Sequence, residues 1–419
     1  MQGMFADKNL HRFQKLRSLL LLLLLPVLVT ACISPVQYGD IPHGDYIADE
    51  RCRPGVQPAE ALADKPYFVV TSRLPDCRTD RIALLNQRSE IVRYGRFGAP
   101  QEMAITNAKG KEKSREVIPF ALNNDQQWWD DLAAAAVKRD GRILLYVHGF
   151  KETFFTSARD SAQISRLSGL DIPVVHYSWP SQGEFLKYAA DETNMYYNER
   201  QFRSFLAKLA QQPWTKEIIL VAHSLGGRLV IPAIEFVDRN SSNADSSNIS
   251  NIILASPDID RQDFERDIVE TVLTMRRVNN DRRITVYVSA KDRALGLSYN
   301  FHGYPRLGRP DCFNPFEATS LRDQGYPERC YAAKTKYDTE PEKSGLTIVD
   351  TTAISRGQTG HSDYLRSGPA CSDFAAVVNR TESETSKRKT TRLLHVFELV
   401  RDPDIAETDD VAECRRNPE

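Results

Sequence analysis

The sequence has little net charge and none of the cysteine spacing that marks a metal site. Its 419 residues include 55 basic and 56 acidic side chains, a formal net charge of -1. A balance this even gives no general attraction to nucleic acid or to anionic lipid. The sequence contains no C-x-x-C pair, no Cys/His spacing typical of zinc and no internal repeat. We therefore expect neither a metal nor a nucleic acid as a partner, and the sequence does not identify a protein partner.

The N-terminus differs from the rest of the chain. Basic residues precede an apolar stretch at 19–29, which is interrupted only by Pro26. This order is typical of a secretory signal, and the stretch is too short to span a bilayer comfortably as a mature helix. The stretch ends in Val29-Thr30-Ala31-Cys32, which resembles the lipobox of bacterial lipoproteins.

The lipobox resemblance implies that residues 1–31 are removed and that Cys32 is lipid-modified and becomes the mature N-terminus. The alternatives are an ordinary signal peptide or an uncleaved anchor. Ile33 stands where an Asp would signal retention in the inner membrane of enteric bacteria. We therefore expect a lipid-anchored protein on the periplasmic side of a bacterial envelope, in the outer rather than the inner membrane.

Cysteine usage is consistent with that compartment. Removing Cys32 from the seven cysteines leaves an even number, which an oxidising periplasm would allow to form three disulfides. Six buried thiols are the alternative. Proximity along the chain predicts the pairs 52 with 77, 312 with 330, and 371 with 414.

The remaining chain has the pattern of one α/β domain. Residues 32–66 are rich in Pro, Gly and charge and are expected to be a tether, the domain spans 67–400, and 401–419 form a tail. Short β-branched runs alternate with amphipathic stretches, which predicts a mostly parallel sheet flanked by helices. Strands are expected at 67–71, 143–147, 174–178, 218–222, 252–255, 284–289 and 346–349, and helices at 125–139, 157–166, 196–211, 226–238 and 262–276.

Two segments interrupt this alternation. Residues 239–250 have the composition of a polar surface loop, and residues 297–344 form a long excursion between the sixth and seventh expected strands. We interpret the second as an insertion and a candidate lid. The charged stretch 380–392 is expected to be a solvated loop.

The sharpest chemical signal is the run Ala222-His223-Ser224-Leu225-Gly226, which follows an apolar strand and precedes a helical pattern. Small residues on both sides of a serine allow the tight strand–turn–helix elbow that exposes a nucleophilic hydroxyl. Ala222 stands where glycine is more usual. The alternative is a helix entrance without chemistry.

A second strand ends in Tyr146-Val147-His148-Gly149-Phe150. In hydrolases with such an elbow, one backbone N–H of the oxyanion hole comes from the loop after an early strand and the other from the residue after the nucleophile. These donors are therefore expected at Phe150 and Leu225. His148 is interpreted as a residue that orients this loop rather than as a proton carrier.

Several motifs occur in a characteristic order: YVHGF (146–150), HYSWPS (176–181), AHSLGG (222–227), ASPDID (255–260), SAKDRAL (289–295) and TGHSDY (359–364). Together they resemble a bacterial α/β-hydrolase family, esterase- or lipase-like and catalogued as a domain of unknown function. The resemblance covers about residues 67–365. It implies the α/β-hydrolase fold, a serine nucleophile, and catalysis without a metal or organic cofactor. The segment 179–183 is expected to shape the pocket rim or to be a plain turn at the end of its strand.

The base and the acid are expected in the chain order serine, acid, histidine. His361 follows the last expected strand across a glycine-containing turn and is the favoured base, ahead of His302 in the insertion and His395 in an apolar run. Asp292 follows the strand 284–289 and is the favoured acid. Asp258, at the end of the preceding strand, is the runner-up; otherwise we expect it to cap the helix at Gln262 together with Asp260.

Three functions remain open from the sequence. The first is hydrolysis of a small-molecule or lipid carboxylic ester through an acyl-enzyme. The second is an envelope lipoprotein with an inert hydrolase fold that binds a partner. The third is an amidase or peptidase on the same fold, since the pocket rather than the fold sets the substrate.

Overall fold

A computed structural model describes most of the chain between Tyr67 and Arg401. The described residues are 52, 67–77, 82–98, 100–106, 112–240, 248–268, 282–310, 313–314, 319–320, 330–331, 345–355, 360–381, 388–401 and 414. The predicted signal segment, Cys32 and nearly all of the predicted tether lie outside them. So do Cys312 and most of the predicted insertion.

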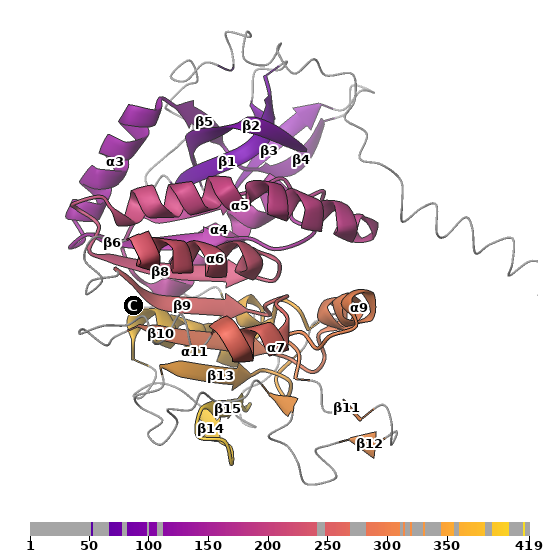
Figure 1. The fold of residues 1–419 in the computed structure, drawn as a ribbon. Helices are drawn as coiled ribbons and strands as arrows, with labels where there is room; N and C mark the ends of the chain where they lie inside the picture. Colours follow the sequence, from indigo (N-terminus) through magenta and orange to yellow (C-terminus); the bar gives the residue numbers. More distant parts are fainter. Residues whose placement is uncertain are drawn as a thin grey trace, which may run out of the picture.

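The centre of the molecule is a mixed sheet in the order β14-β15-β13-β10-β9-β8-β6-β7-β1-β2-β5 (Figure 1). Neighbouring strands from β15 to β1 are parallel. They are β1 (Tyr67–Asp76), β6 (Arg142–Val147), β7 (Val174–Ser178), β8 (Glu217–His223), β9 (Ile249–Ala255), β10 (Arg283–Val288), β13 (Leu346–Asp350) and β15 (Val396–Leu399). Several of these strands are buried along almost their whole length, as expected for parallel strands covered on both faces.

Antiparallel strands close both edges of the sheet. At one edge, β2 (Ala83–Phe97) pairs with β1 and with β5 (Phe120–Asn123). At the other edge, β14 (Arg388–Thr390) pairs with β15. Two short hairpins stand apart from the main sheet: β3 (Gln101–Thr106) with β4 (Glu112–Val117), and β11 (Phe313–Asn314) with β12 (Thr319–Ser320).

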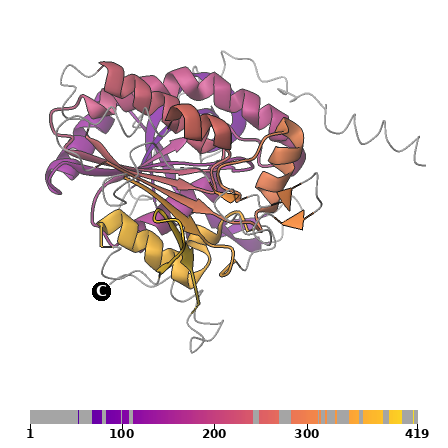
Figure 2. The ribbon, with the colours of Figure 1, turned by 60° about the horizontal axis from the view of Figure 1, so that its bottom comes forward.

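Helices cover both faces of the sheet, as Figure 2 shows with the sheet nearly edge-on. One face packs against α3 (Asp125–Val137), α5 (Tyr188–Ala210) and α6 (Gly226–Asn240). The other packs against α4 (Phe154–Ser168) and α11 (Gly368–Asn379). The short elements are η3 (Phe185–Lys187), α7 (Arg261–Asp263), the π-helical η4 (Phe264–Ile268), α9 (Arg293–His302) and η6 (Asp363–Leu365).

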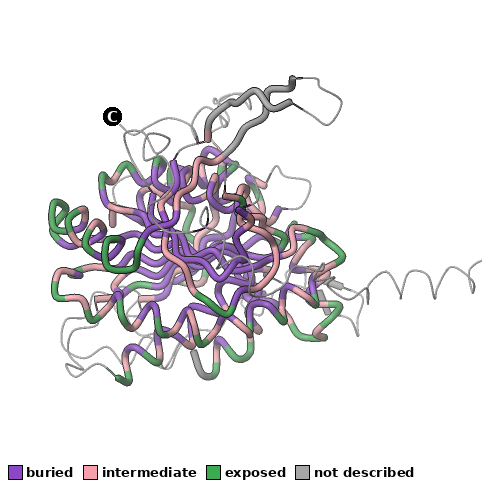
Figure 3. The backbone as a smooth tube through the Cα atoms, turned by 90° about the horizontal axis from the view of Figure 1, so that it is seen from above, coloured by how far each residue is buried: buried purple, intermediate pink, exposed green. Residues whose placement is uncertain are grey.

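The strands are buried and the outer sides of the helices are exposed, so the two apolar cores lie above and below the sheet (Figure 3). The chain passes from β6 to β7 on one side and then returns past β6 to β8 on the other. Ligands of open α/β sheets bind at such a reversal, beyond the carboxyl ends of the strands. The segments that follow β6 and β8 are His148–Phe150 and Ser224, so the fold places both motifs at this point.

The seven predicted strands are all present, and the α/β architecture is confirmed. The helix predicted at 196–211 begins earlier, at Tyr188, where η3 leads directly into it. The charged composition of 380–392 predicts a solvated loop, but Arg388–Thr390 form β14. This strand pairs with β15, and Arg388 forms an ion pair with the buried carboxylate of Asp373. The composition of 380–392 indicates solvation but carries no sign of this edge pairing.

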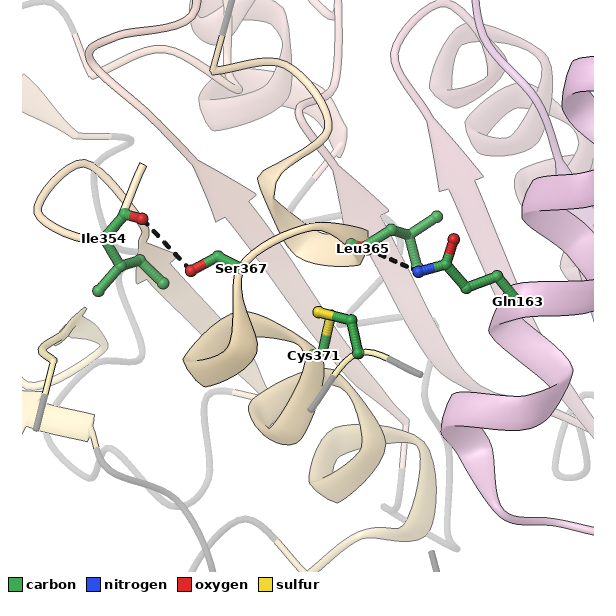
Figure 4. The surroundings of a disulfide bond; sticks show 6 residues. Gln163, Ile354, Leu365, Ser367 and Cys371 are labelled. Carbon is green, nitrogen blue, oxygen red and sulfur yellow. Dashed lines mark hydrogen bonds between the residues drawn. A yellow bond between two sulfur atoms is a disulfide. The ribbon is translucent and has the colours of Figure 1, made fainter. Parts of the chain in front are cut away.

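Disulfides join Cys52 to Cys77 and Cys371 to Cys414, as predicted. Cys330 is also disulfide-bonded, and Cys312 lies outside the described residues. Figure 4 shows Cys371 in α11, close to the hydrogen bonds that Gln163 donates to the Leu365 carbonyl and Ser367 donates to the Ile354 carbonyl. The disulfide between Cys371 and Cys414 therefore fixes Cys414 to α11, the helix that follows η6. In the part of the chain that the structure describes, no helix is both long and apolar enough to cross a membrane.

We predict that removing the Cys371–Cys414 bond destabilises the fold, because it closes a loop of 43 residues in the unfolded chain. In the chain-entropy view, a loop of this length contributes about 4 kcal/mol. Cys414→Ala should therefore unfold at lower denaturant concentration than the parent when both are oxidised, measured by circular dichroism. The two proteins should converge in reductant. Equal midpoints without reductant would contradict this.

Candidate active site

Ser224 lies at a strained turn between β8 and α6. It is buried, and its φ of 51° is in the left-handed region that non-glycine residues rarely adopt. Its N–H donates to the Ala255 carbonyl at 3.0 Å, and its carbonyl accepts from the N–H of Gly227 at 3.1 Å and of Asp258 at 3.2 Å. The elbow predicted from the sequence is therefore held by backbone bonds to the neighbouring strand and to its own helix.

Two glycines allow this turn to approach the end of β6. A Cβ at Gly226 would lie 2.7 Å from the His148 carbonyl oxygen, and a Cβ at Gly149 would lie 2.7 Å from the Cβ of Ser224. Both distances are shorter than side chains tolerate, so any larger residue would push the two segments apart. The loop after β6 and the serine are thus in direct contact.

The two predicted oxyanion donors have free N–H groups. Within the described residues, neither Phe150 nor Leu225 donates its backbone N–H to an acceptor. Both residues are buried, and Leu225 directly follows Ser224. An uncommitted N–H in a buried place is uncommon, and it is what an oxyanion hole requires.

The structure brings His361 and Asp292 together. Nδ1 of His361 lies 2.7 Å from Oδ2 of Asp292, while Oδ1 of Asp292 accepts the N–H of Leu295 at 2.9 Å and caps α9. Each carboxylate oxygen therefore has its own partner. A proton on Nδ1 leaves the lone pair on Nε2, which is buried without a hydrogen-bond partner among the described residues.

The charge of Asp292 makes His361 a stronger base. Burial alone lowers the pKa of the imidazole, but the charge and hydrogen bond of Asp292, with smaller contributions from the charges of Asp258 and Glu152, outweigh this effect, so the pKa of His361 lies above its ordinary value of 6.5. Such a group is a suitable general base close to neutral pH.

His223, immediately before Ser224, supports the backbone of His361. Its Nε2 lies 3.0 Å from the carbonyl oxygen of His361, and the two rings are 4.8 Å apart. Burial, followed by the nearby His361, lowers the pKa of His223 to about 3. The neutral ring can therefore donate from Nε2, which ties the residue before Ser224 to the backbone of His361. The sequence placed His223 in the elbow motif but gave it no role.

Asp258 has a different role from Asp292. It is fully buried, and its carboxylate accepts hydrogen bonds from Ser298 at 2.6 Å, from Arg306 at 2.7 Å and from the hydroxyl of Tyr188. Burial raises the pKa of Asp258, but the charges of Arg228 and then Arg306 outweigh that effect and hold it at about 2. With both oxygens engaged here, Asp258 holds helices together, whereas Asp292 contacts the imidazole.

The expectation that Asp258 caps the helix at Gln262 is wrong, since its carboxylate turns into this buried cluster. Asp260 alone accepts from the N–H groups of Gln262 and Asp263. The two other histidines considered as the base, His302 and His395, have other surroundings. His302 bonds to Glu192 of α5 and to Ser298 of its own helix, α9, and His395 is buried beside β15.

The loop after β6 is supported by the segment that follows β7. The rings of His148 and Trp179 stack at 4.9 Å, and the indole N–H of Trp179 donates to the His148 carbonyl at 2.8 Å. Burial, with Arg73 and His176 nearby, lowers the pKa of His148 well below its ordinary value, so the ring is neutral. His148 thus orients the loop, and Trp179 belongs to its support.

Two buried charges, Arg73 and Asp191, complete this support, and the sequence did not point to either of them. Asp191 accepts from the N–H of Lys151 at 3.1 Å, from the Ser181 hydroxyl at 2.5 Å and from the N–H of Gln182 at 2.6 Å. Arg73 donates to the Glu152 carbonyl at 2.7 Å. No local pattern marks either residue, because the strand and the helix that carry them meet only in the fold.

Burial changes the pKa values of both charges. It lowers the pKa of Arg73 to about 9 against the opposing charge of Asp191. It raises the pKa of Asp191 to about 6 against the hydrogen bonds from Ser181, Lys151 and Gln182. Each ion therefore depends on its partners to remain charged inside the protein.

Comparison with known proteins agrees with this architecture. The model of a family described as alpha/beta hydrolase of unknown function (DUF900) matches residues 126–380. An esterase of Pyrobaculum calidifontis, solved in a monoclinic form, is 13% identical over 72% of this chain and 76% of its own. Its TM-score of 0.24 is too low to support any argument. None of the curated proteins matches. The family model covers more than half of the chain and includes Ser224, Asp292 and His361, and the chain therefore belongs to this family of α/β hydrolases.

Proposed function

We propose that this α/β hydrolase cleaves carboxylic esters with Ser224 as nucleophile, His361 as general base and acid, and Asp292 as the carboxylate that orients the base. The observation that carries the proposal is the bond between His361 Nδ1 and Asp292, which leaves the buried Nε2 unpartnered. The proposal covers carboxylic esters of small molecules as well as those of lipids.

In the first step, the Ser224 hydroxyl attacks the acyl carbon and its proton passes to Nε2 of His361. The imidazolium is stabilised by Asp292, and the carbonyl oxygen becomes an oxyanion that accepts from the N–H groups of Phe150 and Leu225. The C–O bond to the alcohol then breaks, and His361 returns its proton to the alcohol oxygen.

In the second half, water attacks the acyl-enzyme and gives its proton to the same Nε2. The acid leaves, and Ser224 regains its proton. Each oxyanion donor in such a site is worth a factor of about 100 or more in rate. An amide would follow the same steps with a poorer leaving group, so an ester and an amide of the same acyl group should be compared directly.

We predict that a fluorophosphonate probe labels the parent protein and that Ser224→Ala abolishes the labelling, because the serine oxygen displaces fluoride from phosphorus. Ser256→Ala is the matched control: Ser256 is buried, follows β9 as Ser224 follows β8, and has a φ of 44°. The readout is intact mass. Undiminished labelling of Ser224→Ala would exclude this assignment.

We predict that Asp292→Asn lowers kcat by about 10⁴ through loss of the correct tautomer, as for a triad carboxylate. It should also move the acid limb of the pH profile. In the parent, kcat/KM should fall as pH drops through a pKa above 6.5, because the protonated imidazole cannot accept the serine proton. Since the Asp292 charge opposes the effect of burial, the variant's limb should lie at lower pH.

Initial rates from pH 5 to 9 would measure both effects, with circular dichroism to verify folding. An unchanged acid limb in Asp292→Asn would show that the titrating base is not His361.

We also propose that the protein is a bacterial envelope lipoprotein anchored through Cys32. The proposal is supported by the basic segment, the apolar stretch and the Val-Thr-Ala-Cys run before Ile33. Expressed in a bacterium with labelled palmitate, the parent should incorporate label and fractionate with the outer membrane. Cys32→Ala should lose the label while Ser34→Ala keeps it. Labelling of Cys32→Ala would overturn the anchor.

A further inference from the structure

An aromatic surface begins at the proposed oxyanion loop and extends into solvent. The ring of Phe150 lies 5.2 Å from that of Tyr188 and 6.1 Å from that of Phe185. The Tyr188 ring stacks in turn on Phe301, at 5.9 Å and 3°. Phe150 is buried, whereas Phe185 is 46% and Phe301 is 63% exposed. The rings therefore lead continuously from the position of the scissile carbonyl to the surface.

Exposed apolar side chains are concentrated here. Leu186 beside Phe185 is 57% exposed, and Tyr304 after α9 is 54% exposed. Ten large hydrophobic side chains are exposed in the described part of the chain. Four of them lie here: Phe185 and Leu186 in η3, Phe301 in α9 and Tyr304 just after it. Figure 1 shows α9 beside the carboxyl ends of the strands, where the catalytic loops lie.

Polar bonds beneath the rings fix this surface in place. The Tyr188 hydroxyl and Ser298 both donate to Asp258, which joins the start of α5 to α9. One turn further along α5 and α9, Oε1 of Glu192 and Nε2 of His302 are 2.9 Å apart. The stacked pair of Tyr188 and Phe301 is therefore held from below and does not depend on a ligand for its position.

The surface lies on the acyl side of the proposed reaction centre. The ring of His361 packs near that of His223, which in turn packs near Tyr364, and Tyr364 belongs to the apolar core on the α4 and α11 face. Phe150 and Tyr188 belong to the core on the opposite face. Because the leaving alcohol must receive its proton from His361, it lies toward the imidazole, and the acyl group is directed toward the rings.

We propose that Phe185, Tyr188 and Phe301 bind the hydrocarbon chain of a medium- or long-chain acyl group. This inference rests on the proposed ester hydrolysis and specifies its substrate class. The chain would run from the carbonyl at Phe150 over Tyr188 and α9. The path from the ring of Phe150 to that of Phe301 passes over Tyr188, with ring spacings of 5.2 Å and 5.9 Å, so acetyl and butyryl groups end before reaching Phe301.

The test is a series of 4-nitrophenyl esters from acetate to dodecanoate, which keeps the leaving group constant. In the parent, kcat/KM should rise with chain length, by up to about fourfold for each fully covered methylene. In Phe301→Ala and Phe185→Ala, the ratio of kcat/KM for octanoate to that for acetate should fall at least fivefold. Phe301→Leu, which keeps an apolar side chain, should restore part of the ratio.

Phe236→Ala is the matched control, because Phe236 is an exposed aromatic residue in α6, ten residues from the first residue of that helix. It should keep the parent's ratio, and melting curves should show that all variants are folded. A parent that prefers acetate, or an unchanged octanoate-to-acetate ratio in both phenylalanine-to-alanine variants, overturns the acyl surface while leaving Ser224 chemistry intact.

Two further outcomes separate the alternatives. If the variants lose adsorption to phosphatidylcholine vesicles but keep the parent's chain-length ratios, the rings face a lipid surface and the acyl proposal is wrong. If the parent neither hydrolyses any ester nor reacts with a fluorophosphonate at Ser224, the proposed function itself fails, and the acyl surface with it.

Discussion

The carboxylate of Asp292 connects the fold to the proposed chemistry, because its two oxygens accept hydrogen bonds from different partners. One accepts a backbone N–H and starts α9, and the other accepts Nδ1–H of His361. The orientation of the imidazole thus depends on where α9 begins. The far end of the same helix carries Ser298, Phe301 and His302, which contact Asp258, Tyr188 and Glu192. A single ten-residue helix therefore links Asp292, the proposed acid, to the surface proposed for the acyl chain.

Polar groups buried on either side of Ser224 keep its surroundings rigid. On one side, Asp258 gathers Tyr188, Ser298, Arg306 and Arg228 from three helices and a loop. On the other, Asp191 and Arg73 hold the loop that carries Phe150. Buried charges are costly unless paired, so such clusters are stable only when complete. Backbone bonds from Ser224 to Ala255, Gly227 and Asp258 then hold the strained turn between them.

Local sequence was enough to predict the parallel strands and the elbow, because both depend on neighbouring residues. Ile218 to Ala222 form an apolar run, and Ala222, Ser224 and Gly226 fit a turn that admits only small neighbours. The chain order of Ser224, Asp292 and His361 followed from the fold that this motif implied. The bond between His361 and Asp292 agrees with that order.

What the sequence could not decide depends on contacts between distant segments. Asp258 and Asp292 both follow a strand, and only the fold shows that Arg306 returns to one of them while His361 reaches the other. Arg73 and Asp191 are far apart in sequence, and only the fold brings both of them to the loop after β6. Strand β14 forms because β15 offers it an edge, whereas the charged composition of its segment predicted a loop.

The central claim is that the hydroxyl at position 224 lies within reach of the imidazole and beneath two free amide groups. A crystal structure of the protein after reaction with a fluorophosphonate tests it most directly. We expect phosphorus bonded to Ser224 Oγ, with a phosphoryl oxygen about 2.7–3.1 Å from the backbone nitrogens of Phe150 and Leu225. An adduct on another residue, or a phosphoryl oxygen that points away from both nitrogens, would contradict the account.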